Sequence, residues 1–516
     1  MLRAGVKFAT EASRIAVGRS DVTPARGDWR FKDPTWTENP IFSRIAKTYL
    51  AASNAVDSVV DNLAKEAPHR ADQARFVAGI LTSALAPTNY LLGNPAAMKR
   101  AFETGGSSLV SGVGNFLHDM RHNGGMPSMA KPGALKVGED LAITPGDVVH
   151  RDHVAELLQY TPTTAKVRQR PVLVIPPPIG RYYFLDLRPG RSFVEYSVSR
   201  GLQTFLISWR NPSPDEAEWD LDTYTERVLE AIDTVREITG CDEISTIGFC
   251  AGGILNTLAM NYLSAQGERK VHNAAYAVTL LDFGRSAPIG AFSSARLLDV
   301  ARANSQRQGV ISAQAMGSVF SWMRPNDLVW NYWVNNYLMG QDPPVFDILS
   351  WNADGTNLPA CLHKQFLDIF QFNPIVKSGA LTVLDTPVDV ASIHVPIYVT
   401  GAINDHLTPW KGCYQTTQVL SSTDVTFALS NAGHIASLVN PPDNPKASYY
   451  TGPVTRGEGA DTWRAGASQV QGSWWEHWAD WANKRGGKLI PAPTSAGSET
   501  YPSLGSAPGS YVSRAN

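Results

Sequence analysis

The chain has 516 residues, of which 43% are apolar and 18% charged, and its formal net charge is −2. This length exceeds one ordinary domain and predicts two or three globular units with enough apolar material for a core. The near-neutral charge gives no basis for a nucleic-acid partner or for strong attachment to an anionic membrane.

The cysteines and the hydropathy of the sequence argue against several further classes of protein. The four cysteines (Cys241, Cys250, Cys361 and Cys413) form no CxxC pair and have no histidine at metal-ligand spacing. We therefore expect no disulfide framework, no metal site and a reducing, cytoplasmic setting. No apolar run approaches the length of a membrane-spanning helix, and the basic N-terminus lacks the apolar region of a secretory signal.

The first part of the chain is predicted to be mostly helical. Apolar residues recur at helical spacing in "NPIFSRIAKTYLAASNAVDSVVDNL" (39–63) and in "DQARFVAGILTSAL" (72–85). A Pro- and Trp-rich loop precedes the first of these stretches. We expect a helical N-terminal domain with a short β connector over residues 1–165.

Short apolar runs that alternate with helical stretches follow, including "RPVLVIPPP", "LQTFLISWR", "DEISTIGFC", "AYAVTLLDF", "VPIYVTGA" and "DVTFALS". This rhythm predicts an α/β domain over 166–488, with a mostly parallel sheet covered on both faces. The rhythm stops at about 284–392, which is rich in Trp, Tyr, Asn and Pro and reads as an inserted helical cap. Residues 489–516 have the Pro/Ser/Gly composition of a flexible tail.

The stretch "EISTIGFCAGG" has the form of a strand, a sharp turn and the start of a helix, with Cys250 at the apex. Glycines at 248 and 252 allow the tight turn, and Gly253 allows close packing of the helix on the sheet. The N-terminus of a helix favours a thiolate, and the amide of Ala251 is placed to donate to a developing oxyanion. We therefore predict Cys250 as the nucleophile.

A thiol nucleophile needs a base, and the base needs an orienting carboxylate. In this architecture the chain order is nucleophile, acid, histidine. Asp405 follows the strand "VPIYVTGA", and His434 follows the next strand, so we assign His434 as the base and Asp405 as its acid. His406 is a competing base, and Asp282, at the end of "AYAVTLLDF", is a rival acid.

The loop after "PVLVI" is expected to supply a second oxyanion donor. Its first residues are three prolines, which have no N–H group. The first available amide is that of Ile179. The sequence contains no phosphate-binding loop and no dinucleotide fingerprint after a predicted strand, so we expect no cofactor.

The choice of a thiol indicates acyl transfer rather than plain ester hydrolysis. Transfer of an acyl group from a thioester to cysteine conserves the thioester, so the bound group stays reactive towards a weak nucleophile such as an alcohol. Such transfer requires that water be kept out, which an aromatic cap would do. A Cys-dependent thioesterase or polyester depolymerase remains the alternative, because the turn alone permits it.

Several motifs together resemble the polyhydroxyalkanoate synthases: "GDWRFKDPTWTENPIF", "PPPIGRYYFLDLRPG", "FLISWRNPSPDE", "GFCAGG", "WNADGTNLP", "GAINDHLTPW" and "GHIASLVNPP". The resemblance runs from about residue 28 to about residue 486. It implies an α/β-hydrolase fold with an inserted cap and a helical N-terminal domain. It also implies an acyltransferase that polymerises (R)-3-hydroxyacyl-CoA into polyester and releases CoA, with Cys250, Asp405 and His434 as the catalytic residues.

The resemblance has further implications for assembly and mechanism. The long N-terminal domain is similar to that of the single-subunit synthases of class I or II. These relatives are homodimers in the cytoplasm that associate with the surface of polymer granules, and CoA enters only as part of the substrate and product. In the family the aspartate is also credited with activating the 3-hydroxyl of the incoming monomer, which implies a second role for Asp405.

Overall fold

The computed structural model describes residues 2–284 and 295–513, which form two compact units. The first unit contains residues 2–132 and Gln314–Ala353. The second contains 133–284, 295–313 and 354–513. No helix within these described residues is both long and apolar enough to cross a bilayer.

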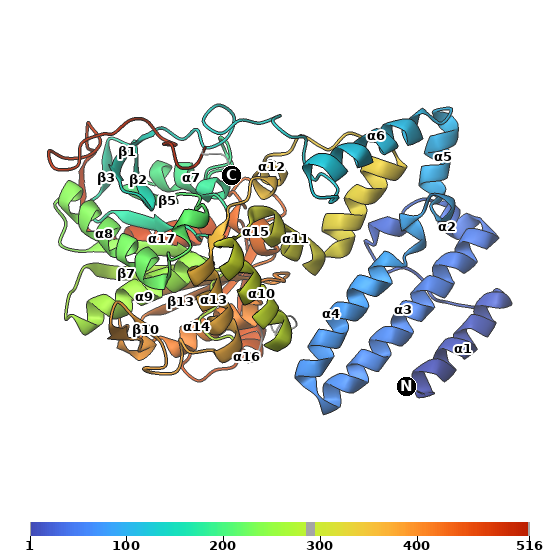
Figure 1. Cartoon of the computed structure of the whole chain (residues 1–516). Coiled ribbons are helices and arrows are strands. Elements are labelled where there is room, and N and C mark those ends of the chain that lie inside the picture. The colour runs from blue at the N-terminus through green and yellow to red at the C-terminus, as the bar shows by residue number, and fades with distance from the viewer. Residues whose placement is uncertain (1, 285–294, 514–516) are drawn as a thin grey trace. The chain divides into compact units, whose positions relative to one another are not determined.

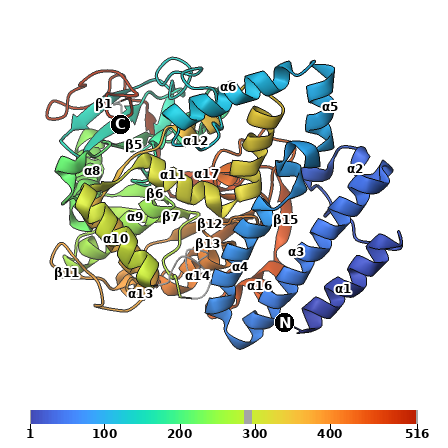
Figure 2. The ribbon, with the colours of Figure 1, turned by 45° about the vertical axis from the view of Figure 1, so that its right-hand side comes forward.

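Three long helices of the first unit lie side by side: α1 (Leu2–Ala16), α3 (Pro40–Glu66) and α4 (Pro68–Ala84) (Figures 1 and 2). The side chain of Asn39 accepts hydrogen bonds from the amides of Ile41 and Phe42, and proline follows it, so α3 begins at a capped position. The Phe31 and Trp36 rings pack edge to face at 5.0 Å beneath this helix start. The helical N-terminal region predicted from periodicity is thus present.

The same unit also contains α5 (Pro95–Glu103), α6 (Ser107–His122) and the later elements α12 (Asp347–Ala353), η7 (Asn326–Trp330) and η8 (Trp333–Leu338). The hydroxyl of Tyr337 donates to the buried Asp119 at 2.7 Å. A Cβ on Gly112 would lie 1.9 Å from the carbonyl oxygen of Tyr337, so η8 packs directly on α6. Part of the segment that the sequence assigned to a cap therefore groups with the N-terminal helices. Residues 285–294 of that segment lie outside the described residues.

The second unit is built on a ten-stranded sheet of order β1-β2-β5-β4-β6-β7-β12-β13-β14-β15. Its parallel centre consists of β5 (Thr204–Trp209), β4 (Val172–Ile175), β6 (Ile244–Phe249), β7 (Val271–Ala277), β12 (Ile397–Ala402) and β13 (Val425–Ser430). The antiparallel edges are β1 (Gly146–Arg151), β2 (Ala155–Tyr160), β14 (Ser448–Gly452) and β15 (Ser468–Gln471).

The connector predicted at the end of the N-terminal domain differs from the structure. Strands β1 and β2 pair with the main sheet through β5, so the division between the units falls at residues 132 and 133 rather than at 165. Their antiparallel pairing explains the difference. Alternation between helices and strands identified only the parallel centre, and edge hairpins do not show that rhythm.

Helices cover both faces of the sheet (Figure 1). On one face α8 (Leu221–Thr239) packs against α9 (Ala251–Ala265). On the other, Phe193 of α7 (Phe193–Ser199) contacts the rings of Trp474, Trp475 and Trp478 in α17 (Trp474–Arg485). Because both faces are covered, all six residues of β5, β6 and β12 are buried, as expected for a sheet of this kind.

Smaller elements complete the second unit. These are α10 (Ala295–Gln308), α13 (Ala360–Phe372), α14 (Trp410–Val419), α15 (His434–Leu438) and α16 (Ala460–Gly466), and the short pairs β3 (Lys166–Arg168) with β16 (Leu489–Pro491), β8 (Val310–Ile311) with β9 (Leu358–Pro359), and β10 (Thr382–Val383) with β11 (Thr386–Pro387). α11 (Ala313–Met323) leads from this unit into the first.

Residues 489–513 have defined contacts where the sequence predicted a flexible tail over 489–516, and residues 514–516 lie outside the described residues. Strand β16 pairs with β3, and the amide of Leu504 donates to Val148 of β1 at 2.8 Å. Tyr511 and Val512 are 4% and 2% exposed. Composition suggested disorder because the segment contains few apolar residues, but a few buried anchors and backbone pairing with an open sheet edge are enough to dock it.

Candidate active site

Cys250 occupies the sharp turn between β6 and α9, as the sequence predicted. Its backbone has φ 50° and ψ −120°, a conformation that is uncommon for residues other than glycine and that occurs at functional turns. The amide of Cys250 donates to the Ala277 carbonyl at 2.8 Å, and the Thr279 hydroxyl donates to the Cys250 carbonyl at 3.0 Å. These bonds hold the strained residue in place with its side chain partly exposed.

The glycines around Cys250 are needed because the chain packs closely there, and not because their backbone conformation is unusual. Gly248, Gly252 and Gly253 are absent from the positive-φ residues of the described chain, so the strain falls on Cys250 itself. A Cβ on Gly252 would lie 2.1 Å from the carbonyl oxygen of Ile175, and one on Gly253 would lie 2.2 Å from the Thr279 hydroxyl. The turn therefore packs directly against the end of β4.

Asp405 and His434 come together because β12 and β13 are parallel neighbours whose carboxyl ends meet at one edge. Beyond the strands, the amide of Ile403 donates to Ser430 at 2.9 Å and that of Asn404 to Ala432 at 3.0 Å. The Nδ1 atom of His434 lies 2.7 Å from Oδ2 of Asp405, and both side chains are buried.

The electrostatics of this pair favour a charged imidazole. Burial alone would lower the pKa of His434, but the Asp405 carboxylate and hydrogen bonds to Asp405 and to the Cys250 side chain raise this pKa to about 10. Burial acts to raise the pKa of Asp405, and its interactions with His434 and Thr408 outweigh burial and lower it. The imidazole of His434 is therefore held next to the Cys250 side chain, with which it forms a hydrogen bond.

Thr408 belongs to this arrangement and was missed in the sequence. Its hydroxyl donates to Asp405 Oδ2 at 2.8 Å and lies 3.1 Å from Nδ1 of His434. The amides of Leu407 and Thr408 donate to Asp405 Oδ1 at 2.8 and 2.9 Å. An Asp followed three positions later by Thr is a common turn motif, and this pattern in the sequence could have identified Thr408.

Asp405 is fully enclosed by these contacts. Its side chain is 0% exposed, and both carboxylate oxygens accept hydrogen bonds. The carboxylate therefore has no free surface with which to contact a monomer hydroxyl, and the second role implied by the family resemblance finds no support in this geometry.

The rival residues are placed differently. Strand β7 ends at Ala277, five residues before Asp282, so Asp282 does not stand at a strand end as predicted. Its carboxylate accepts from the Asn373 side chain at 2.7 Å and from the Gly284 amide at 2.8 Å. The histidine that forms a hydrogen bond with Asp405 is His434, the fourth residue after β13 and the first residue of α15.

The predicted oxyanion donors lie at the start of α9 and in the loop after β4. Ala251 is the first residue of α9, and its amide donates to no carbonyl or side chain in the described part of the chain. The same holds for the amide of Ile179. The next amide, that of Gly180, donates to the Thr356 hydroxyl at 2.8 Å and is thereby occupied.

Cys413 is a second thiol close to the site. It is 0% exposed, and burial raises its pKa well above the ordinary value, with further contributions from Asp405 and Cys250. Such a thiol is inert compared with the partly exposed Cys250. In the part of the chain that the structure describes, no group of three or more His, Cys, Asp and Glu side chains is arranged to hold a metal ion.

Two family models together match residues 27–441 of the sequence. The family model "Poly-beta-hydroxybutyrate polymerase (PhaC) N-terminus" matches residues 27–197, and the model "alpha/beta hydrolase fold" matches residues 188–441. Among solved structures, a soluble variant of monoglyceride lipase from Saccharomyces cerevisiae is 12% identical, with a TM-score of 0.39 over 69% of this chain and 100% of that one.

Relatives with curated names are much more similar. Poly(3-hydroxyalkanoate) polymerase 1 of Ectopseudomonas oleovorans is 42% identical over 98% of this chain and 90% of its own length. The poly(3-hydroxyalkanoate) polymerase subunit PhaC of Cupriavidus necator is 37% identical over 98% of this chain and 86% of its own length. With its α/β-hydrolase sheet and helical N-terminal region, the chain belongs to the poly(3-hydroxyalkanoate) polymerases, a family of acyltransferases.

Proposed function

We propose that this enzyme polymerises (R)-3-hydroxyacyl-CoA thioesters into polyhydroxyalkanoate and releases CoA through a covalent thioester on Cys250. The observation that carries the proposal is a partly exposed thiol in a strained turn, next to a buried His434–Asp405 pair. A serine in this position would form an oxoester and lose the activation of the acyl group. The names of the relatives support the same polymer product.

In the first step the Cys250 thiolate attacks the carbonyl carbon of the hydroxyacyl-CoA. The oxyanion accepts hydrogen bonds from the amides of Ala251 and Ile179. The bond between the carbonyl carbon and the CoA sulfur then breaks, and the leaving CoA thiolate takes the proton of the His434 imidazolium. The products are a hydroxyacyl thioester on Cys250 and free CoA.

In the second step the 3-hydroxyl of another acyl unit attacks the thioester carbonyl. Its proton passes to neutral His434, an ester bond forms, and the Cys250 thiolate is regenerated. The enclosed carboxylate of Asp405 takes part by orienting His434 and stabilising its charged form, because its own oxygens are occupied.

The proposal includes a homodimer in the cytoplasm and attachment to the surface of the polymer granule. An exposed apolar stripe on α6 supports the second point. Its members recur at helical spacing: Val110 (75% exposed), Val113 (58%), Leu117 (49%) and Met120 (54%). An apolar face of this kind suits contact with a hydrophobic polyester surface.

Incubation with (R)-3-hydroxybutyryl-CoA tests the proposed function. We expect CoA release together with insoluble polyester that yields crotonic acid when heated with acid. Release of CoA with only free 3-hydroxybutyrate would refute the polymerase and favour the thioesterase. Hydrolysis of preformed polyester, without CoA-dependent synthesis, would identify a depolymerase.

A further inference from the structure

The loop that follows β4 is fixed by residues from distant parts of the second unit. After Gly180, whose amide donates to Thr356 at 2.8 Å, comes Arg181, whose side chain is only 3% exposed. Its Nε atom donates to Oδ1 of Asp354 at 3.1 Å, and Nη1 donates to the backbone carbonyl of Tyr511 at 3.1 Å. One buried guanidinium thus ties this loop to Asp354 and to the end of the chain.

Asp354 is itself held from a second side. The hydroxyl of Tyr183 donates to Oδ2 of Asp354 at 2.9 Å, while Arg181 contacts Oδ1. Arg181 and Tyr183 both belong to the segment after β4, so the Asp354 carboxylate links two residues of that segment. A buried guanidinium with fixed partners on two sides has little freedom to move.

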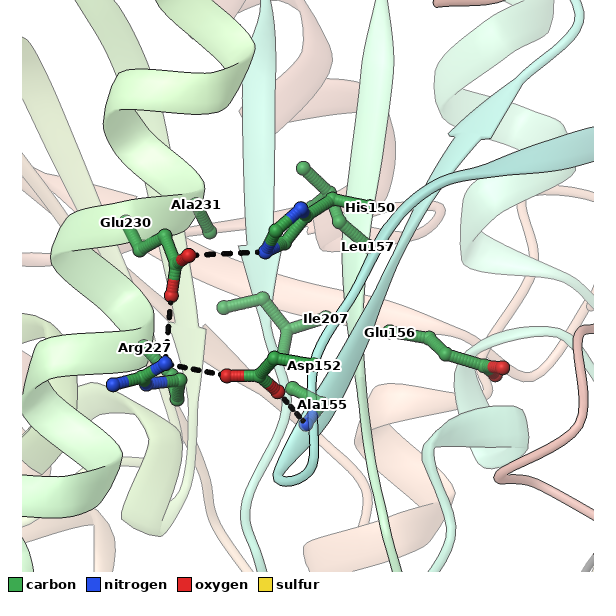
Figure 3. A pocket seen from close by; sticks show the side chains of 9 residues that line it. All are labelled: His150, Asp152, Ala155, Glu156, Leu157, Ile207, Arg227, Glu230 and Ala231. Carbon is green, nitrogen blue, oxygen red and sulfur yellow. Dashed lines mark hydrogen bonds and ion pairs between the residues drawn. The ribbon is translucent and has the colours of Figure 1, made fainter. Parts of the chain in front are cut away.

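The Tyr511 carbonyl is held in place by a buried acid on β2. Glu156 is 0% exposed and accepts hydrogen bonds from the amide of Ser510 at 3.0 Å, its hydroxyl at 2.7 Å and the amide of Tyr511 at 3.0 Å. Arg151 donates to the same carboxylate at 2.6 Å. Figure 3 shows Glu156 turned away from the ion pairs that join Arg227 with Asp152 and Glu230, and its carboxylate binds Arg151 and the C-terminal segment instead.

Glycine and backbone pairing complete the docking of this segment. A Cβ on Gly509 would lie 2.3 Å from Oε2 of Glu156, and Gly509 has φ 79°, so another residue would be strained and would collide here. The amide of Val148 donates to Gly505 and that of Ala507 to Gly146, both at 2.8 Å. The segment therefore extends the edge of the sheet along β1.

These contacts matter for the active site because the loop that they fix packs, at its start, against the turn that carries Cys250. The packing of Gly252 on Ile175 and Pro176 fixes one end of the loop, and the Arg181 contacts fix the other. The amide of Ile179, the proposed second oxyanion donor, lies between these two fixed points. Small displacements of such donors slow catalysis strongly, because they act on the transition state.

We propose that Arg181 is a positioning residue. Through their contacts with Arg181, Asp354 and the docked segment Ser510–Val512 hold the loop so that the Ile179 amide keeps its position. The inference rests on the proposed function for the role of Ile179. It predicts that loss of Arg181, or of the docked segment, lowers kcat while the thiol of Cys250 remains intact.

The test compares two altered enzymes with two controls. Arg181→Met removes the guanidinium, and a chain that ends at Gly509 removes the Tyr511 carbonyl while leaving Arg181 in place. The matched controls are Arg200→Met, which breaks a surface ion pair with Asp480, and a chain that ends at Ser513, which keeps Tyr511. CoA release, alkylation of Cys250 by iodoacetamide and hydrogen exchange of residues 176–183 are measured for each.

We expect both altered enzymes to lose kcat by about 10- to 100-fold with little change in KM, as for a misplaced transition-state donor. Iodoacetamide should alkylate Cys250 at the wild-type rate, because the Cys250–His434 pair is untouched, and exchange of 176–183 should become faster. Wild-type kcat, or an equal fall in kcat and alkylation, would overturn the inference.

Hydrogen exchange separates a failure of this inference from a failure of the proposed function. A wild-type enzyme that releases no CoA would refute the function. Even then, unchanged exchange of 176–183 in both altered enzymes would show that Arg181 and the C-terminal segment do not position the loop.

Discussion

The Nδ1 atom of His434 lies 2.7 Å from Oδ2 of Asp405, although the two residues follow different strands of the sheet. Parallel pairing of β12 with β13 brings the two loops to one edge, where backbone bonds between them fix the geometry. The pair holds the histidine in one orientation and leaves its other ring nitrogen for the thiol.

Replacement of Cys250 tests the nucleophile. Cys250→Ala should lower CoA release by at least about 10³-fold, the order found when a nucleophile is removed from such an arrangement. Cys250→Ser should also fail to sustain polymer growth, because an oxoester is a poor acyl donor to an alcohol. Cys361→Ser is the matched control, since Cys361 contacts Glu218 rather than the site.

Replacement of the acid distinguishes the two carboxylates. Asp405→Asn should lower kcat by about 10²- to 10⁴-fold, because the histidine loses both its orientation and the charge that stabilises the imidazolium. Asp282→Asn should retain most activity, since Asp282 contacts Asn373 and Gly284. Steady-state CoA release decides between them, and the opposite pattern would move the acid to Asp282.

Sequence reasoning placed the parallel strands and the residues at their ends, because a buried apolar run followed by a polar loop is a local signal. It did not identify Thr408, whose importance depends on the approach of His434 from another strand. It also read residues 489–516 as flexible, since pairing with the edge strand β1 is a non-local property. Composition likewise gave no sign that residues 314–353 pack with the N-terminal helices.

Thr408 should matter through its hydroxyl. Thr408→Val removes the donor to Asp405 and leaves a buried carboxylate oxygen with one bond fewer, so kcat should fall and the pH profile of activity should shift. Thr408→Ser keeps the hydroxyl and should restore most of the activity. Equal activity of the Val and Ser variants would show that the hydroxyl has no such role.

The raised pKa of His434 predicts how stability depends on pH. A group whose pKa is higher in the folded protein stabilises the fold fully below its unfolded value, about 6.5 for histidine. That contribution is lost as the pH rises to the folded value of about 10. The difference in Tm between wild type and His434→Gln should therefore be largest near pH 6 and shrink towards pH 10. A difference that grows with pH would contradict the assignment.

Close packing of the nucleophile turn predicts a large effect at Gly252. An added methyl would collide with the Ile175 carbonyl, so Gly252→Ala should lower the free energy of unfolding by about 1–3 kcal/mol or more. Gly114→Ala is a matched control in α6, where a Cβ has open space and should be neutral or stabilising. Urea unfolding measures both, and equal stability of the two variants would be incompatible with this packing.

The covalent thioester on Cys250 is tested most directly by acid quenching during turnover, followed by mass spectrometry of peptides. With (R)-3-hydroxybutyryl-CoA, the account predicts that the Cys250 peptide carries one or more hydroxybutyryl units, that hydroxylamine removes them, and that Cys250→Ala carries none. Polymer formation with an unmodified Cys250 peptide, or with the adduct on Cys413, would contradict it.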